Sequence, residues 1–144
     1  ERTLTKVRNK SFYYLLIATI VLTLIQVTLG TQVRQFVDEQ VKVFGYDQME
    51  QILAQPEMSF YVHRSLSILV VVTFVLLYRK NRLLNLGFEK TTWLMWILAA
   101  EIISGIAMAY LAFPMGAQTL HLLAASILFG VQYFLYLEYQ NHSK

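Results

Sequence analysis

The stretch FYVHRSLSILVVVTFVLLYRK, residues 60–80, decides the fold class. It places His63 and Arg64 at one end of an apolar run, and Arg79 and Lys80 close the other end. About 20 apolar residues are needed to cross a hydrocarbon core of ~30 Å. Residues 60–80 therefore predict a transmembrane helix that carries an imidazole inside one end.

The composition of the whole chain points the same way. Of its 144 residues 56% are hydrophobic and only 15% are charged, which is outside the range of ordinary soluble domains. The first apolar run is too long for a removable signal peptide and lacks its small-residue cleavage site. Four spans with short connections predict an all-α fold, a transmembrane four-helix bundle of up-down-up-down topology, in one domain covering 1–144. The predicted spans are about 11–33, 59–78, 91–113 and 118–138, and the third is followed by Pro114 and Gly116.

The distribution of cations predicts the orientation in the membrane. Nine lysines and arginines fall on the side of both termini, namely Arg2, Lys6, Arg8, Lys10, Arg79, Lys80, Arg82, Lys90 and Lys144. Three fall on or near the other side, namely Arg34, Lys42 and Arg64. Because cytoplasmic loops carry the excess of Lys and Arg, both termini are expected to be cytoplasmic. The net charge of +3 then reflects topology and needs no nucleic acid as partner, while membrane lipid is the expected surroundings.

The outer loop, residues 34–58, is the sizeable segment outside the membrane. Its apolar residues recur at helical spacing, so the first helix is expected to continue beyond the bilayer as far as Gly45. Asp47 and Glu50 resemble a capping box that would start a short surface helix over 48–54. A plain solvated connector is the alternative.

Two histidines lie inside the spans at matched depth. His63 is about one turn below the outer surface in the second span, and His121 takes nearly the same level in the fourth, which runs the same way. Two such imidazoles on different helices can coordinate one haem iron, one from each face of the porphyrin. Small neighbours leave room for a porphyrin, namely Ser67, Ala117, Ala124 and Ala125. The alternatives are hydrogen bonds between helices, or zinc, which would lack two of its usual four ligands.

Three other ionisable residues have two interpretations each. Arg34 and Arg64 lie on the outer side and can pair with haem propionates, or they can snorkel to lipid headgroups. Glu101 lies near the middle of the third span, where it can relay protons or make a structural hydrogen bond to a partner such as Gln26, Gln132 or a tyrosine. His142 in the polar tail is expected to be solvated. The sequence shows no internal repeat. It has no cysteine, which excludes disulfides and thiolate metal sites.

Three segments together resemble the C-terminal half of haem A synthase, in the form found in Bacteroidetes-type bacteria. They are LIQVTLGTQVRQFVDEQ (24–40), FYVHRSLSILV (60–70) and EIISGIAMAYLAFPMGAQTLHLLAASILFGVQ (101–132). The shared features are a G-x-x-V-R end of the first helix, an H-R start of the second and a Q-x-L-H start of the fourth.

This resemblance implies an integral protein of the bacterial inner membrane with haem near the outer leaflet. Members of the family have eight spans in two pseudo-symmetric halves and oxidise the C8 methyl of haem O to the formyl of haem A for terminal oxidases. The N-terminal half holds the substrate haem and a catalytic glutamate. The C-terminal half binds haem b through two histidines that match His63 and His121.

This chain departs from the family pattern in having four spans, without the glutamate motif of the substrate half and without the cysteine pair of many relatives. It is therefore expected to be part of a larger protein, to pair with a second four-span chain, or to act as a dimer like the short archaeal relatives. Alone it is expected to bind haem b through bis-histidine ligation without converting haem O. A b-type cytochrome subunit that only transfers electrons, or a structural subunit without cofactor, are the competing interpretations.

Overall fold

The computed structural model describes residues 9–112 and 116–143 and is all-helical over these ranges. The helices are α1 (Lys10–Phe44), a 3-10 turn (Tyr46–Gln48), α2 (Met49–Ala54), α3 (Met58–Leu83), α4 (Lys90–Tyr110) and α5 (Ala117–Ser143). Four of them, α1, α3, α4 and α5, are long and apolar enough to cross a membrane. The predicted all-α fold with four membrane-spanning helices is confirmed.

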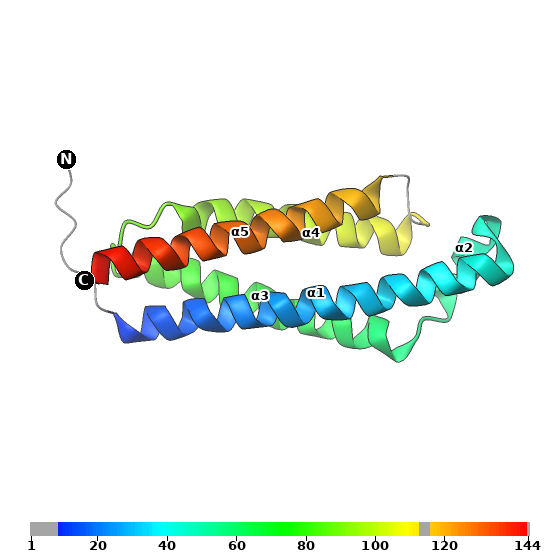
Figure 1. The fold of residues 1–144 in the computed structure, drawn as a ribbon, viewed down its shortest axis with the longest axis horizontal. Coiled ribbons are helices and arrows are strands. Elements are labelled where there is room, and N and C mark those ends of the chain that lie inside the picture. The colour runs from blue at the N-terminus through cyan, green and yellow to red at the C-terminus, as the bar shows by residue number, and fades with distance from the viewer. Residues whose placement is uncertain (1–8, 113–115, 144) are drawn as a thin grey trace.

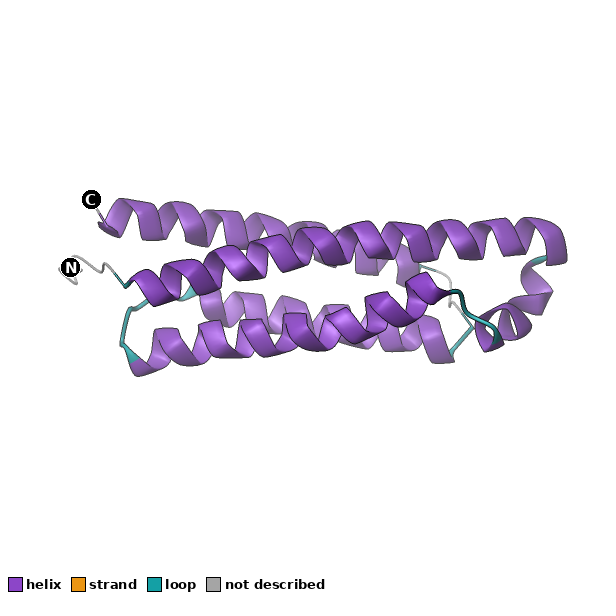
Figure 2. Cartoon of the chain, turned by 90° about the horizontal axis from the view of Figure 1, so that it is seen from below, coloured by secondary structure: helices purple, strands orange, loops and turns teal. Residues whose placement is uncertain are grey.

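The four long helices lie side by side as an antiparallel bundle of up-down-up-down topology (Figure 1). α1 packs beside α3 and α4 packs beside α5, so the bundle consists of two helical pairs. The start of α1 and the end of α5 lie at one end of the bundle, and α2 lies at the other (Figure 2). We call these the termini end and the α2 end.

Several helix ends differ from the predicted span boundaries. The helices α3 and α5 continue to Leu83 and Ser143, beyond the predicted ends at 78 and 138, whereas the third long helix, α4, is shorter than predicted. It ends at Tyr110 rather than 113, and Ala112 has a positive φ of 52°. Pro114, which the sequence suggested as its terminator, lies outside the described residues. So do four of the cations used to predict orientation, Arg2, Lys6, Arg8 and Lys144.

α1 is longer than a membrane is thick. Its 35 residues extend for about 52 Å at 1.5 Å per residue, against ~30 Å of hydrocarbon. It ends at Gly45, whose φ of 84° favours glycine, as predicted. The predicted short helix is confirmed by α2, but the Asp47 capping box is wrong. Asp47 lies inside the 3-10 turn, and the residue before α2 is Gln48, which makes no side-chain cap.

The hydrophobic core occupies the half of the bundle at the termini end. Phe12 is fully buried and stacks on Phe88 with ring centroids 5.3 Å apart. The other members of the cluster are Leu16, Val70, Phe74, Leu77, Leu86, Leu94, Leu98, Leu128, Leu135 and Tyr139. In the part of this core toward the α2 end, a buried hydrogen bond of 3.2 Å joins Gln132 Nε2 on α5 to Thr23 Oγ1 on α1. This bond marks the boundary between the packed half and the α2 end.

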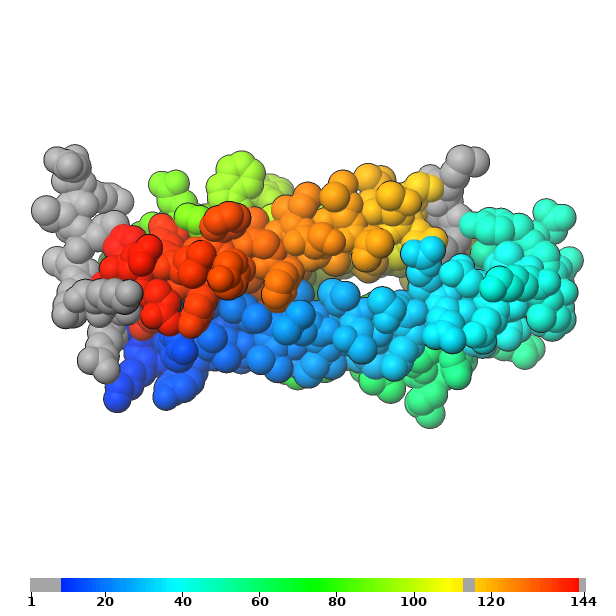
Figure 3. All heavy atoms as spheres, viewed as in Figure 1, coloured from blue at the N-terminus to red at the C-terminus, as the bar shows by residue number. Residues whose placement is uncertain are grey.

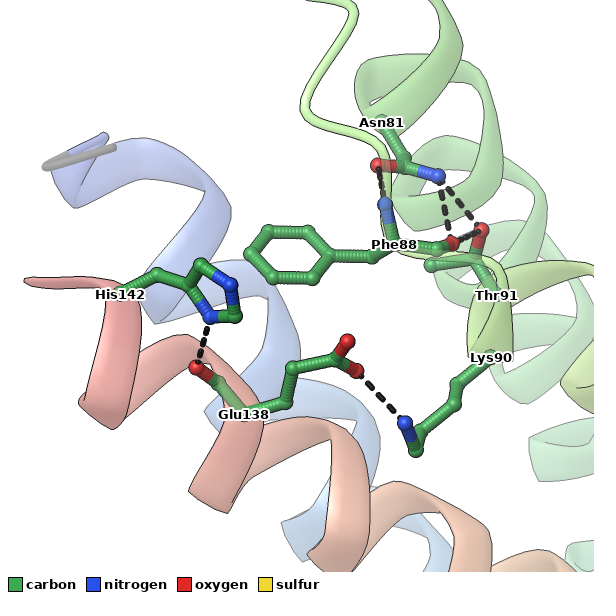
Figure 4. A network of polar contacts seen from close by, with 6 residues as sticks. All are labelled: Asn81, Phe88, Lys90, Thr91, Glu138 and His142. Atoms are coloured by element: carbon green, nitrogen blue, oxygen red, sulfur yellow. Dashed lines mark hydrogen bonds and ion pairs between the residues drawn. The ribbon is translucent and has the colours of Figure 1, made fainter. Parts of the chain in front are cut away.

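Asn81 organises the connection between α3 and α4 (Figure 4). Its amide Nδ2 donates to the main-chain oxygen of Phe88 at 2.8 Å and to Thr91 Oγ1 at 2.7 Å. Its Oδ1 accepts from the main-chain N–H of Phe88 at 3.1 Å. A single buried side chain thus satisfies both polar groups of Phe88 and sets where α4 begins.

The same end is tied together by contacts between α4 and α5 (Figure 4). Lys90 Nζ pairs with Glu138 Oε2 at 2.8 Å. His142 donates from Nδ1 to the main-chain oxygen of Glu138 at 2.7 Å and lies edge-on to the ring of Phe88. The prediction that His142 is simply solvated is therefore wrong, because its ring covers the end of the core.

Asn81→Ala should destabilise the bundle without altering its membrane insertion. Removing Asn81 breaks three hydrogen bonds in a buried turn and leaves the main-chain N–H of Phe88 unpaired, while the Phe88 oxygen keeps its bond from Thr91 Oγ1. The expected cost is roughly 1–3 kcal/mol in the free energy of unfolding. Thermal unfolding of the purified protein in detergent would measure this. Glu89→Gln is the matched control, because Glu89 is exposed on the same connection and should change the midpoint little. Equal midpoints for both variants would contradict the role given to Asn81.

Candidate cofactor site

A cavity of about 480 Å³ lies between the two helical pairs toward the α2 end. This volume is within the ~300–1,000 Å³ range of pockets that bind cofactors and other small molecules. The space-filling view shows the surface hollowed between α1 and α5 in this half of the molecule (Figure 3). Its lining is mostly apolar, and the polar side chains that reach it are Thr23, Gln26, His63, Arg64, Ser67, Glu101 and His121.

His63 and His121 line this one cavity from different helical pairs. His63 lies five residues after Met58, the first residue of α3, and His121 lies four residues after Ala117, the first residue of α5. Both helices start at the α2 end and run in the same direction, so the two imidazoles enter the cavity at matched levels. The structure thus brings together the two residues that the sequence selected as iron ligands, while ligation itself stays a prediction.

His121 is held by two side chains of α4. Its Nδ1 lies 2.8 Å from Ser104 Oγ and 3.2 Å from Glu101 Oε2. The side chain of Glu101 is only 13% exposed, so this carboxyl group is directed inward. The partners predicted for Glu101 were wrong, since Gln26 and Gln132 are engaged by His63 and Thr23 instead.

His63 is held by one side chain of α1. Gln26 Nε2 donates to the main-chain oxygen of His63 at 2.9 Å and lies 3.5 Å from its ring Nε2. The ring Nδ1 of His63 is buried and has no hydrogen-bond partner among the described residues. The two imidazoles therefore have unequal surroundings, although they occupy equivalent places.

A glycine faces each imidazole from the neighbouring helix. A Cβ atom on Gly30 of α1 would lie 3.3 Å from His63 Cε1, and one on Gly105 of α4 would lie 3.6 Å from His121 Cε1. Larger side chains at these two positions would displace the rings. Glycine thus gives each imidazole room beside a closely packed helix.

The two helical pairs repeat this arrangement. Gln26 precedes Gly30 by four residues, and Glu101 precedes Gly105 by four, so each pair places a polar residue and a glycine one turn apart against a histidine. This repeat is not evident from the sequence alone. The missed signal is Q-x-x-x-G in α1 and E-x-x-x-G in α4, too short to detect without knowing that both face a histidine.

The arginines predicted to meet propionates lie in different surroundings. Arg64 lines the cavity, and its Nη2 donates to Tyr110 Oη at 3.3 Å. Arg34 is not among the lining residues, and its Nε pairs with Asp38 Oδ2 at 3.3 Å along the exposed face of α1. Arg64 is therefore the arginine at the cavity, while Arg34 lies beyond it on the part of α1 that extends toward Gly45.

Small residues near the histidines contribute unequally to the cavity. Ser67 and Ala125 line it, whereas Ala117 and Ala124 do not. Within the described ranges no group of three or more His, Cys, Asp or Glu side chains is placed to hold a metal ion. The donor set is two imidazoles on opposite helical pairs with apolar space around them, which suits a flat metal complex that brings its own in-plane ligands.

Comparison with known proteins identifies the family. Neither the search of curated proteins nor the search of solved structures found a match. The scan of family models matched the model described as cytochrome oxidase assembly protein, COX15-CtaA, over residues 2–133. The match covers most of the chain and confirms the resemblance to the haem A synthase family. The chain is a membrane-spanning member of the COX15-CtaA family of cytochrome oxidase assembly proteins.

Proposed function

We propose that this chain is the haem-b-binding half of a haem A synthase, with His63 and His121 as the two axial ligands. The observation that carries the proposal is the meeting of these two imidazoles in one largely apolar cavity, with a glycine beside each ring. Haem b held in this way supplies one-electron transfer. Family membership supports a role in haem A biosynthesis for oxidase assembly.

The polar residues of the cavity have separate roles in this proposal. His121 presents its Nε2 to the cavity because its Nδ1 is engaged by Ser104 and Glu101. Gln26 holds the main chain of His63, which fixes the first turns of α3 against α1. Arg64 at the cavity is the candidate partner for one propionate, with Tyr110 orienting its guanidinium. Arg34 is proposed as a second propionate partner, which requires it to leave Asp38.

The proposed orientation places both termini in the cytoplasm and the histidines near the outer leaflet of the bacterial inner membrane. The cations at the termini end support it, since Arg79, Lys80, Arg82 and Lys90 gather there within the described residues. The α2 end carries Arg34, Lys42 and Arg64. An excess of cations on one side is typical of the cytoplasmic face.

The oxidation of the haem O methyl is assigned to a partner half that carries the catalytic glutamate. That half is either another part of the same protein or a second four-span chain. The face available for it is apolar, since Trp93, Trp96 and Ile103 of α4 are 64–72% exposed. The same residues are suited to contact with lipid.

Purified protein should show the visible spectrum of six-coordinate, low-spin haem b, and His63→Ala or His121→Ala should abolish that spectrum. Each substitution removes one axial nitrogen from a bis-histidine site. His142→Ala is the matched control, because this histidine lies at the termini end and contacts Glu138. Colourless wild-type protein after addition of haem b, or a low-spin spectrum that survives both cavity substitutions, would rule the proposal out.

Gly30→Leu and Gly105→Leu should each weaken haem binding by displacing an imidazole. Overpacking costs about 1–3 kcal/mol, which corresponds to roughly 5- to 150-fold in affinity. Titration with haem in detergent measures the change. Gly130→Leu is the control, because a Cβ there meets nothing within 4 Å. Unchanged affinity in both cavity variants would show that the glycines do not serve the site.

Haem O supplied to this chain alone should remain unconverted, since the proposed catalytic half is a separate unit. Chromatography of the extracted haems distinguishes haem O from haem A. Adding a four-span substrate half that carries the catalytic glutamate should restore conversion. Formation of haem A by this chain alone would contradict the division of labour, and absence of conversion with the partner half would favour a cytochrome that only transfers electrons.

A further inference from the structure

We propose that the two iron ligands are inequivalent: His121 is the firmly held ligand, positioned by Glu101 and Ser104, and His63 is the exchangeable one. The inference rests on the proposed haem-binding function. It follows from the different hydrogen bonds that the two helical pairs make to equivalent imidazoles.

The hydrogen bonds around His121 fix which ring nitrogen is free. Ser104 Oγ donates its hydrogen to the main-chain oxygen of Glu101 at 3.0 Å, so toward the histidine it can only accept. The Nδ1 atom of His121, 2.8 Å away, must therefore carry the hydrogen. Glu101 Oε2 at 3.2 Å is a second acceptor for it. The lone pair of His121 is thus on Nε2, the state required of a ligand, before any iron is bound.

The hydrogen bonds around His63 act differently. A main-chain oxygen only accepts, so the bond of 2.9 Å from Gln26 Nε2 to the His63 oxygen fixes which end of the Gln26 amide is the donor. The same NH₂ group lies 3.5 Å from ring Nε2 of His63. Gln26 thus holds the main chain and competes weakly for the ligating nitrogen. It offers no acceptor to Nδ1, which is buried without a partner among the described residues.

This difference determines ligand strength. An acceptor on the second nitrogen orients an imidazole and raises its basicity, and loss of such a partner typically costs 10- to 100-fold in metal affinity. His121 has two such acceptors and His63 has none in the described structure. Dissociation of one axial ligand should therefore occur on the His63 side, which would open that face of the iron to a small exogenous ligand.

The first experiment compares His63→Gly with His121→Gly after both purified proteins are titrated with haem b. His63→Gly should keep five-coordinate haem through His121, and added imidazole should restore the low-spin spectrum. His121→Gly should bind haem at least about tenfold more weakly than His63→Gly. Carbon monoxide should give the ferrous wild-type protein and ferrous His63→Gly the same spectrum, because both adducts retain His121.

The second experiment tests the positioning role through the reduction potential of the bound haem. Glu101→Leu should raise the potential, because the ligand becomes a weaker electron donor, and should weaken haem binding about 10- to 100-fold. Glu101→Gln keeps an acceptor oxygen and should stay near wild type. Ser104→Ala should shift the potential in the same direction as Glu101→Leu. Ser126→Ala is its control, because the Ser126 hydroxyl donates to the main-chain oxygen of Leu122 in its own helix and is not among the residues that line the cavity.

The outcomes separate this inference from the proposed function. Wild-type protein that binds no haem would overturn both. Wild-type protein with low-spin bis-histidine haem, combined with equal losses in the two glycine variants or the reverse order, would overturn the inference alone. An unchanged potential in Glu101→Leu would do the same. Circular dichroism and gel filtration of each variant before haem addition identify any that fail to fold, and Glu101→Gln and Ser104→Ala then supply the readout.

Discussion

A bilayer offers no water to satisfy polar groups, and this constraint shapes the contacts within the four spans. The main chain meets it by forming helices throughout the spans. The side chains meet it at two levels of the bundle: Gln132 bonds to Thr23, and nearer the α2 end the two histidines take partners from α1 and α4. Among the described residues, the few buried side-chain nitrogen and oxygen atoms without hydrogen-bond partners belong to Gln26, His63, Glu101 and Gln132, and these residues line the cavity or lie next to it. Buried side-chain atoms without hydrogen-bond partners are thus concentrated around the proposed cofactor site in the described structure.

Much of the fold could be predicted because the signals are long. Four apolar runs of about 20 residues specify four helices, and Gly45 specifies where α1 stops. The predicted capping box at Asp47 was wrong because a helix cap requires one particular main-chain conformation. In the structure Asp47 lies inside a 3-10 turn instead. Boundaries of this kind are decided by a few local hydrogen bonds, which a periodic pattern does not encode.

The sequence predicts the level of each site residue along the bundle, but not its partners. Helix direction and position place His63 and His121 at one level, but they do not say which face of a helix a residue occupies. Glu101 could therefore be recognised as unusual without its partner, which proved to be His121 rather than a glutamine. Ser104 and Gly30 were not predicted as site residues, because serine and glycine are common in membrane helices for general packing reasons. The prediction for His142 was wrong because its contact with Phe88 joins residues far apart in the sequence and depends on the packing of α5 against the α3–α4 connection.

The uneven distribution of packing along the bundle has a consequence for assembly. The large buried side chains gather at the termini end, whereas the α2 end holds the cavity and the surface hollow between α1 and α5. The packed core holds the four helices together at the termini end, and the cavity separates the two helical pairs toward the α2 end. The proposed cofactor would therefore occupy a part of the bundle on which the large buried side chains do not depend, so its insertion need not disrupt the packed end.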